Sequence, residues 1–310
     1  MGKYSEDTEW DDVTPFPQDD GPSPNPLAAI NYTEEYAEAM AYLRASIAAN
    51  DLSLRLMGLT QDIISMNPAH YTVWLYRAKV IFHNKLDLND ELEWVNETAF
   101  NNLKNYQIWH HRQMILEKMD TVPDGEANFI EQMLEKDNKN YHVWSYRQWL
   151  VKRFGIWNDQ ELGWTESMID DDVRNNSAWN HRWFLVFGRE AGKAPEKAIV
   201  DRELEYTQSK IRLAPQNQSP WNYLRGLLKQ AKVPVASQKD FALEFASLDR
   251  PDDVHSSHAL DLLADIYAGN NDQKEQAKQA LELLAQRYDP IRANYWHYRK
   301  SLLEQRSATA

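Results

Sequence analysis

The amino-acid sequence predicts an all-α protein, a solenoid built from short antiparallel helix pairs. The first observation is a period, because four tryptophans, Trp74, Trp109, Trp144 and Trp179, follow one another at intervals of 35 residues. The second is a companion residue, since an arginine stands three positions after each of them. The third is that no stretch shows the apolar–polar alternation of a half-buried strand. A fixed period of this length is typical of stacked helical hairpins.

The chain begins with a segment that lies outside this period. The string TPFPQDDGPSPNP contains five prolines and has no helical pattern. Residues 1–33 are therefore expected to be extended and ordered only where they lie against the rest of the chain. The helical repeats are expected over residues 34–304, and residues 305–310 are expected to fray.

One central unit shows the expected hairpin most clearly. The string NDELEWVNETAFNNL supplies a first helix, with Asn89 or Asp90 as its N-cap. The string NYQIWHHRQMILEKM supplies the second helix, with Ile108 and Ile115 among its apolar positions. A proline and a glycine then mark the turn into the next unit.

The later units are less regular. Trp221 follows Trp179 after 42 residues, and Trp296 follows after a further 75. The longer step is attributed to a loop insertion at GREAGKAPEK, whose glycine and proline content is that of a loop. The gap is close to twice the period, so a degenerate copy is expected near SSHALDLLADIY.

The repeated tryptophan and arginine have a structural interpretation. At positions i and i+3 of a helix the two side chains lie on one face. Tryptophan is expected to pack between repeats, and arginine is expected to tie adjacent hairpins to acidic partners.

The turn before each tryptophan varies in a way that packing does not explain. Five residues before the tryptophan, the successive units have Ala69, Lys104, Lys139, Arg174, Gln216 and Ile291. Three residues before it, the first three units have tyrosine, at Tyr71, Tyr106 and Tyr141. Equivalent positions line up along one edge of a regular solenoid, so the central basic residues would form a row. Helix amino-terminal ends favour anions, so a phosphate or carboxylate is a sensible ligand there. The alternative is that Asn105 and Asn140 simply cap helices while the lysines are solvated.

Composition excludes several classes of function. The 310 residues carry a formal net charge of −13, which argues against nucleic acid as a partner through a broad basic face. The chain has no cysteine, hence no disulfide and no thiolate metal site, which fits a reducing compartment. No apolar stretch is long enough to span a membrane, and the amino terminus lacks a signal-peptide core. A cytoplasmic protein is expected.

No complete catalytic apparatus is visible. His110 and His111 point about 100° apart on a helix and cannot easily share a metal. His255 and His258 could share a face but lack a third ligand, so no metal site is expected in this chain. The sequence has no convincing glycine-rich phosphate loop, nucleophile elbow or paired-carboxylate motif.

The N-x-x-x-W-x-x-R hairpins resemble protein prenyltransferase alpha-subunit repeats. The strings PFPQDDGPSPNP, NYQIWHHR, KNYHVWSYRQW, DVRNNSAWNHRWFLV and SPWNYLRGLL are similar to the CaaX-type family, whose alpha subunit is shared by farnesyltransferase and geranylgeranyltransferase type I. The likeness covers about residues 9–302 and is strongest over 71–228. It implies an alpha-alpha superhelix, a right-handed crescent of about seven helical hairpins that wraps around a catalytic beta subunit.

The resemblance also implies an activity that this chain has only within a heterodimer. A farnesyl or geranylgeranyl group would pass from its diphosphate to a cysteine near the carboxyl terminus of CaaX-motif proteins, such as Ras- and Rho-type small GTPases. Zinc would be held by the beta subunit and not by this chain, and magnesium would assist pyrophosphate departure in the farnesyl enzyme. The resemblance leaves open which beta subunit is bound, and hence which isoprenoid is transferred.

On the isoprenoid side, the resemblance assigns four residues. Lys104 would contact the diphosphate and stabilise the charge that builds on the departing pyrophosphate. Tyr141 and His142 match residues near the diphosphate, and Asn140 would support them.

On the peptide side, the resemblance assigns three residues. Gln107 matches a residue that hydrogen-bonds the terminal carboxylate of the CaaX peptide, and Tyr106 lies beside that pocket. Tyr71 matches a residue that lines the pocket for the last peptide side chain, although His70 stands where relatives usually have asparagine.

Two alternatives are weighed against this interpretation. A noncatalytic tetratricopeptide-like scaffold has a similar period, but its W-x2-L-G-x2-Y pattern is absent. A Rab geranylgeranyltransferase alpha subunit would need an escort protein and would act on paired terminal cysteines. The string PQDDGP and the repeated Lys-Asn-Tyr motif favour the CaaX type.

Overall fold

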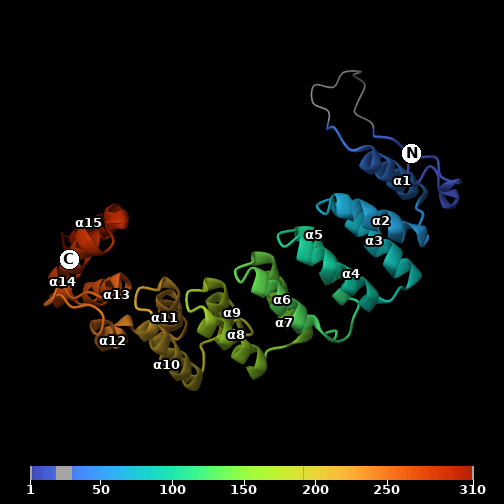
Figure 1. The fold of residues 1–310 in the computed structure, drawn as a ribbon. Helices are drawn as coiled ribbons and strands as arrows, with labels where there is room; N and C mark the ends of the chain where they lie inside the picture. The colour runs from blue at the N-terminus through green and yellow to red at the C-terminus, as the bar shows by residue number, and fades with distance from the viewer. Residues whose placement is uncertain (1, 19–29, 191, 309–310) are drawn as a thin grey trace. The chain divides into compact units, whose positions relative to one another are not determined.

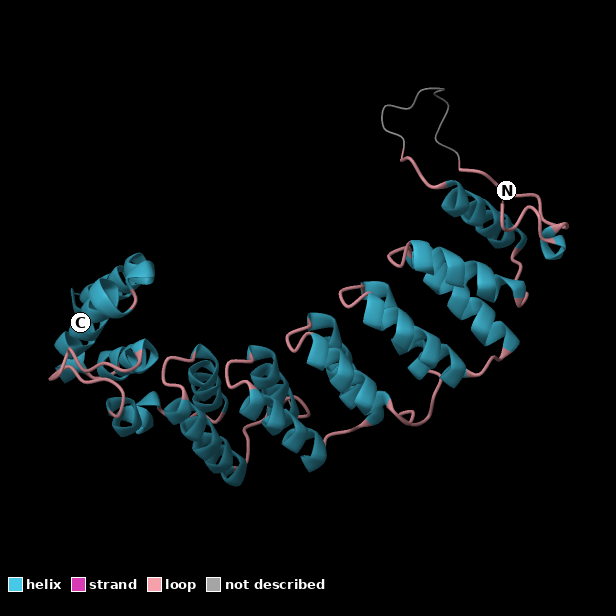
Figure 2. Ribbon diagram, viewed as in Figure 1, coloured by secondary structure: helices cyan, strands magenta, loops and turns pink. Residues whose placement is uncertain are grey.

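The computed structural model describes residues 2–18, 30–190 and 192–308 of the chain. Within these ranges the regular elements are fifteen α-helices together with short 3-10 and π-helical segments, and no strand is present (Figures 1 and 2). The expected all-α class is confirmed. Most of the proline-rich string expected to be extended falls on residues 19–29, which lie outside the described residues.

The chain divides into two units, and the first covers Met1–Ile156. It contains α1 (Glu34–Ala49) and then three hairpins: α2 (Arg55–Met66) with α3 (Tyr71–Asn84), α4 (Leu88–Asn101) with α5 (Tyr106–Leu116), and α6 (Glu126–Lys136) with α7 (Tyr141–Phe154). The helices of each hairpin contact one another, and the second helices α3, α5 and α7 also pack in chain order. Helix α1 begins at Glu34, and the expected start of the repeats at residue 34 stays a prediction.

The second unit covers Trp157–Ala310. Its helices are α8 (Asp159–Asp171), α9 (Asn176–Phe187), α10 (Lys197–Leu213), α11 (Gln218–Gln230), α12 (Lys239–Leu243), α13 (Ser257–Ala268), α14 (Lys274–Leu283) and α15 (Ala293–Ala308). The expected insertion is the connection between α9 and α10, and the expected degenerate copy contains α13, which packs on α14. Helix α15 continues to Ala308, past the boundary expected at residue 304.

The helix caps correct one expectation and confirm another. Helix α4 begins earlier than expected, because the carboxylate of Asp87 accepts the backbone N–H of Asn89 (2.8 Å). Asn89 and Asp90 lie inside the first turn and are not the cap. Asn105 and Asn140 do cap the second helices α5 and α7, as the structural interpretation of these residues required.

The repeated tryptophans are core residues of the two units, three in each. All six are buried, with at most 5% of their surface exposed: Trp74, Trp109, Trp144, Trp179, Trp221 and Trp296. Four of the rings, those of Trp74, Trp109, Trp179 and Trp221, pack on aromatic residues of neighbouring helices, as Trp109 does on Phe129 of α6 and Tyr146 of α7. The expectation that tryptophan packs between repeats is confirmed.

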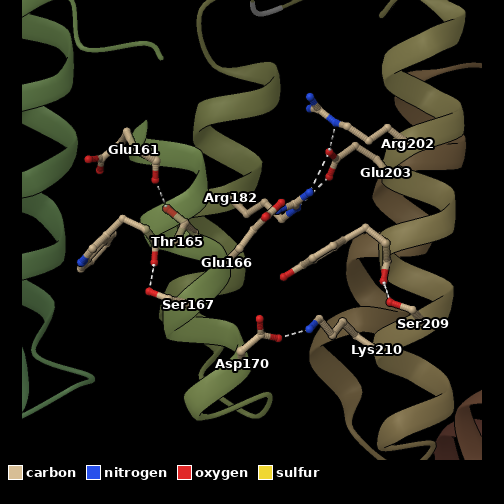
Figure 3. Close-up of polar contacts among 12 residues, drawn as sticks. Glu161, Thr165, Glu166, Ser167, Asp170, Arg182, Arg202, Glu203, Ser209 and Lys210 are labelled. Atoms are coloured by element: carbon tan, nitrogen blue, oxygen red, sulfur yellow. Dashed lines mark hydrogen bonds and ion pairs between the residues drawn. The ribbon is translucent and has the colours of Figure 1, made fainter. Parts of the chain in front are cut away.

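The repeated arginines join adjacent hairpins. Three of them lie on second helices and bind a buried glutamate of the next first helix, in the pairs Arg77–Glu91, Arg112–Glu126 and Arg182–Glu203. Figure 3 shows Arg182 between Glu166 of α8 and Glu203 of α10. In the degenerate region, Arg225 and Arg299 both bind the two aspartates of α13, Asp261 and Asp265. The expected role of these arginines is confirmed.

The amino-terminal segment is more structured than its composition suggests. Residues Thr8–Trp10 form a 3-10 helix, and Trp10 is buried against Tyr4 and against Tyr42 of α1. The guanidinium of Arg55 on α2 lies over the Trp10 ring, 4.8 Å from its centroid. This segment therefore packs on α1 and α2, so part of the region expected to be extended is a packed helical turn. No described helix is long and apolar enough to cross a membrane.

Candidate functional site

Two short turns, together with the first turns of the helices that follow them, carry most of the residues expected to form the site. The turn 102–105 precedes α5 and holds Lys104, and the turn 137–140 precedes α7. The Asn105 side chain accepts hydrogen bonds from two backbone N–H groups of the first turn of α5 (2.7 and 3.2 Å). Asn140 does the same for α7 (3.0 and 3.4 Å). The caps thus fix where each helix begins and which side chains its first turn presents.

Lys104 presents its ammonium group to solvent. Its side chain is 81% exposed, and its Nζ lies 3.8 Å from Oδ2 of Asp137, a carboxylate that is 27% exposed. An exposed pair of this kind contributes about 0–1 kcal/mol, so it competes weakly with a multiply charged ligand. Lys104 is therefore available to an anion such as a diphosphate.

An aromatic cluster lies beside Lys104. The ring of His142 packs edge-on against Tyr106 (4.3 Å between centroids) and against Tyr141 (5.6 Å). Both tyrosines are the first residues of their helices and are mostly exposed. Burial, and then the positive charge of Lys104, lower the pKa of His142 below its ordinary value. At neutral pH the imidazole is therefore uncharged and can donate one hydrogen bond without adding charge.

Replacing Lys104 with methionine should raise the pKa of His142. The change removes the positive charge that disfavours the imidazolium but leaves the burial of the ring, so the pKa returns only part of the way. An NMR titration of the histidine ring protons measures this shift. His258 is the control, because burial and the charge of Arg292 lower its pKa, and it should not respond. An unchanged His142 pKa would mean that the Lys104 charge does not act on the imidazole.

The expected peptide-side residues lie near this cluster or one repeat away. Gln107 is the second residue of α5, and its side chain is half-buried. Tyr71 is the first residue of α3, mostly exposed, with its ring centroid 6.4 Å from that of His70. His70 provides no side-chain cap, and this is the physical consequence of the missing asparagine. In the described part of the chain, neither Tyr71 nor the Gln107 side chain hydrogen-bonds to the Lys104 cluster.

Asn140 differs from the other expected site residues because it is buried. Only 3% of its surface is exposed. Its Oδ1 caps α7, and its Nδ2 donates to the backbone oxygen of Leu103 (2.8 Å). Both ends of the amide are thus bound within the protein.

One residue near the site escaped the sequence analysis. Asp137 is the acidic neighbour of Lys104 and also accepts the backbone N–H of Lys139 (3.2 Å). A signal was available, because the residue seven positions before the repeated tryptophan changes from asparagine, at 67 and 102, to aspartate, at 137 and 172.

The expected basic row stays a prediction. Lys104 and Lys139 belong to equivalent turns of the first unit. Arg174 occupies the same position before α9, where its backbone N–H binds Asp172 (2.9 Å), but this turn is part of the second unit.

Potential metal ligands are not clustered in the part of the chain that the structure describes. Across residues 2–18, 30–190 and 192–308, no three histidine, aspartate or glutamate side chains are placed to hold a metal ion.

Comparison with known proteins gives a consistent result. A family model described as "Protein prenyltransferase alpha subunit repeat" matches residues 54–84, 88–119, 123–154, 158–188 and 200–231. A protein from Solanum lycopersicum named "Protein farnesyltransferase/geranylgeranyltransferase type-1 subunit alpha" is 42% identical, over 97% of this chain and 91% of the relative. A relative of the same name from Candida albicans is 39% identical, over 95% of this chain and 97% of its own.

The fold is also similar to a solved structure. A chain of Candida albicans protein geranylgeranyltransferase-I, complexed with GGPP, superposes with a TM-score of 0.87 at 38% identity. The match covers 96% of this chain and 100% of that chain. The expected fold class, an alpha-alpha superhelix, is confirmed.

Proposed function

The chain belongs to the protein prenyltransferase alpha subunit family, and we propose that it is the alpha subunit of a heterodimeric CaaX prenyltransferase. The observation that carries the proposal is the cluster of Lys104 with Tyr106, Tyr141 and His142, in a chain that matches CaaX-type alpha subunits over nearly its whole length. The enzyme transfers a farnesyl or geranylgeranyl group from its diphosphate to a cysteine thiol.

Lys104 has the central chemical role in this proposal. When the bond from the isoprenoid carbon to the diphosphate oxygen breaks, negative charge builds on the departing pyrophosphate. A fixed ammonium group stabilises that charge more than it stabilises the bound substrate, and so it accelerates the reaction. Tyr141 and the neutral His142 supply hydrogen-bond donors beside it without a proton transfer.

The peptide-side residues act by binding. The amide of Gln107 donates to the terminal carboxylate of the CaaX peptide, and Tyr106 and Tyr71 offer aromatic surface for its last side chains. The substrates in this proposal are CaaX-motif proteins of the Ras and Rho type, reached in the cytoplasm.

The partner supplies what this chain lacks. In this proposal the beta subunit holds the zinc, and magnesium assists the departure of pyrophosphate. The beta subunit also decides whether a C15 or a C20 isoprenoid is transferred. Neither the Rab-type subunit nor a noncatalytic scaffold is favoured, because the relatives reported above bear the CaaX-type name.

Reconstitution tests the proposal. Prenyl transfer to a CaaX peptide is measured with zinc and magnesium, first for this chain alone and then after coexpression with a candidate beta subunit. Activity is expected only in a copurified 1:1 complex, and C15 and C20 donors identify which complex has formed. Failure to form a stable complex with any CaaX-type beta subunit would contradict the assignment and direct the test to the Rab-type enzyme.

A further inference from the structure

The N-cap residues of four helices, three asparagines and one serine, hydrogen-bond to the preceding repeat. In each case the side chain caps its own helix and also donates to a backbone carbonyl of the preceding turn. The bonds are Asn105 to Pro68 (2.8 Å), Asn140 to Leu103 (2.8 Å), Asn217 to Val173 (2.6 Å) and Ser256 to Pro215 (2.6 Å). One side chain thus couples the turns of two neighbouring repeats.

At most of these carbonyls a tryptophan is a second donor. The indole N–H donates to the carbonyl six residues before it, as in Trp74 to Pro68 (2.8 Å), Trp179 to Val173 (2.9 Å) and Trp221 to Pro215 (2.8 Å). The peptide group is therefore held from its own helix and from the next repeat at once. Two donors on one carbonyl restrict the turn more than one does.

The turn that carries Lys104 is the exception. Trp109 is buried like its counterparts, yet its indole N–H has no hydrogen-bond partner among the described residues. The Leu103 carbonyl therefore accepts a hydrogen bond from the Asn140 side chain but none from the tryptophan of its own repeat. That carbonyl belongs to the peptide bond that leads directly into Lys104. Toward the following repeat, the backbone that leads into the proposed catalytic lysine is thus held by the Asn140 amide alone among these side-chain donors, while Asn105 of the same turn binds the preceding repeat.

The oxygen of the same Asn140 side chain fixes the start of the helix that carries Tyr141 and His142. Oδ1 of Asn140 accepts the backbone N–H groups of His142 and Val143, and so fixes the first turn of α7 that presents Tyr141 and His142. The amide therefore links the Lys104 turn to these two side chains through two hydrogen-bonding ends.

We propose that Asn140 is a positioning residue for Lys104, which holds the lysine turn in register with Tyr141 and His142 and does not itself touch the substrate. The inference rests on the proposed function of Lys104 in pyrophosphate departure. Small displacements of a catalytic group cost up to about 100-fold in rate, so a freed turn lowers kcat even when the fold persists.

The sharpest variant is Asn140→Asp in the reconstituted heterodimer. Aspartate retains the oxygen that caps α7 but loses the N–H that holds the Leu103 carbonyl. Measured at pH 8 to keep the carboxylate ionised, kcat should fall by about 10-fold or more, with KM for the isoprenoid diphosphate changed less than about 3-fold. Asn140→Ser should restore most of kcat, since Ser256 shows that a hydroxyl can both cap a helix and donate to the preceding turn.

Asn217→Asp is the matched control. It makes the same chemical change at the Val173 carbonyl, where the Trp179 indole still donates, and it lies in the unit without the Lys104 cluster. Its kcat should remain within about 2-fold of the parent enzyme, because the lost hydrogen bond lies away from the Lys104 cluster and can lower only the stability of the fold. If Asn140→Asp lowers kcat no more than Asn217→Asp does, the positioning role is wrong.

A double-mutant cycle with Lys104→Ala decides through which residue Asn140 acts. If it acts through Lys104, then adding Asn140→Asp to Lys104→Ala costs no further kcat. Full additivity of the two losses would overturn the inference while leaving the role of Lys104 intact. If Lys104→Ala alone leaves kcat unchanged, both the proposed role of Lys104 and the inference that depends on it fail.

Discussion

Replacing Lys104 with alanine in the heterodimer is expected to lower kcat for prenyl transfer on the order of 100-fold, while affinity for the isoprenoid diphosphate changes much less. Lys104 stands in an exposed turn, and its only close charged partner among the described residues is the partly exposed Asp137. In the ground state the diphosphate charge is shared with other groups of the enzyme and with solvent. As the carbon–oxygen bond breaks, new charge develops on the departing oxygen, and there a preplaced cation matters most.

Single-turnover kinetics and direct binding of the diphosphate separate the two effects. Lys118→Ala is the control, because it removes an exposed lysine just beyond the other end of α5. Lys104→Arg should recover part of the rate, since it returns the charge with a different geometry. An unchanged kcat together with a collapse in diphosphate affinity would show that Lys104 serves binding and not the transition state.

The fold was predictable because the same residue types pack at the same positions of successive repeats. A buried tryptophan and an arginine at fixed spacing need particular residue types, so the sequence displays them at each repeat. The amino-terminal segment was less predictable, because its proline content suggested extension while the packing of Trp10 on Tyr42 depends on residues distant in the chain. The cap of α4 was missed by two residues, since Asp87, Asn89 and Asp90 are all suitable caps by type.

For the candidate site, the sequence suggested which residues to consider but not the contacts between them. The variation of the turns drew attention to Lys104, and the resemblance supplied Tyr141 and His142. The bond from Asn140 to the Leu103 carbonyl leaves no trace in the sequence, because every residue carries a carbonyl group. The free indole of Trp109 is equally invisible, since the same residue type makes the bond in other repeats.

The largest expected effect on stability follows from the buried ion pairs between hairpins. Replacing Glu203 with alanine should lower the free energy of unfolding by about 3–5 kcal/mol, because it leaves the Arg182 guanidinium buried without its main partner. Arg182 and Glu203 are both fully buried, and their two bonds measure 2.8 and 2.9 Å. Burial works against the charged guanidinium, yet the bonds to Glu203 hold the pKa of Arg182 above its usual value. The Tyr223 hydroxyl, which donates to Glu203 (2.7 Å), would also lose its acceptor.

Urea unfolding of the heterodimer at one fixed concentration measures this loss. The matched control is Glu244→Ala, which breaks a pair of the same forked geometry, Arg212–Glu244, with side chains that are 51% and 43% exposed. That change should cost no more than about 1 kcal/mol, because solvent replaces the lost partner. Replacing Arg182 and Glu203 together with leucine and methionine should cost less than Glu203→Ala alone, since no uncompensated charge remains. If Glu203→Ala and Glu244→Ala lower the free energy of unfolding equally, the buried Arg182–Glu203 pair contributes no more than an exposed pair. The proposal that such buried pairs hold neighbouring hairpins together would then be wrong.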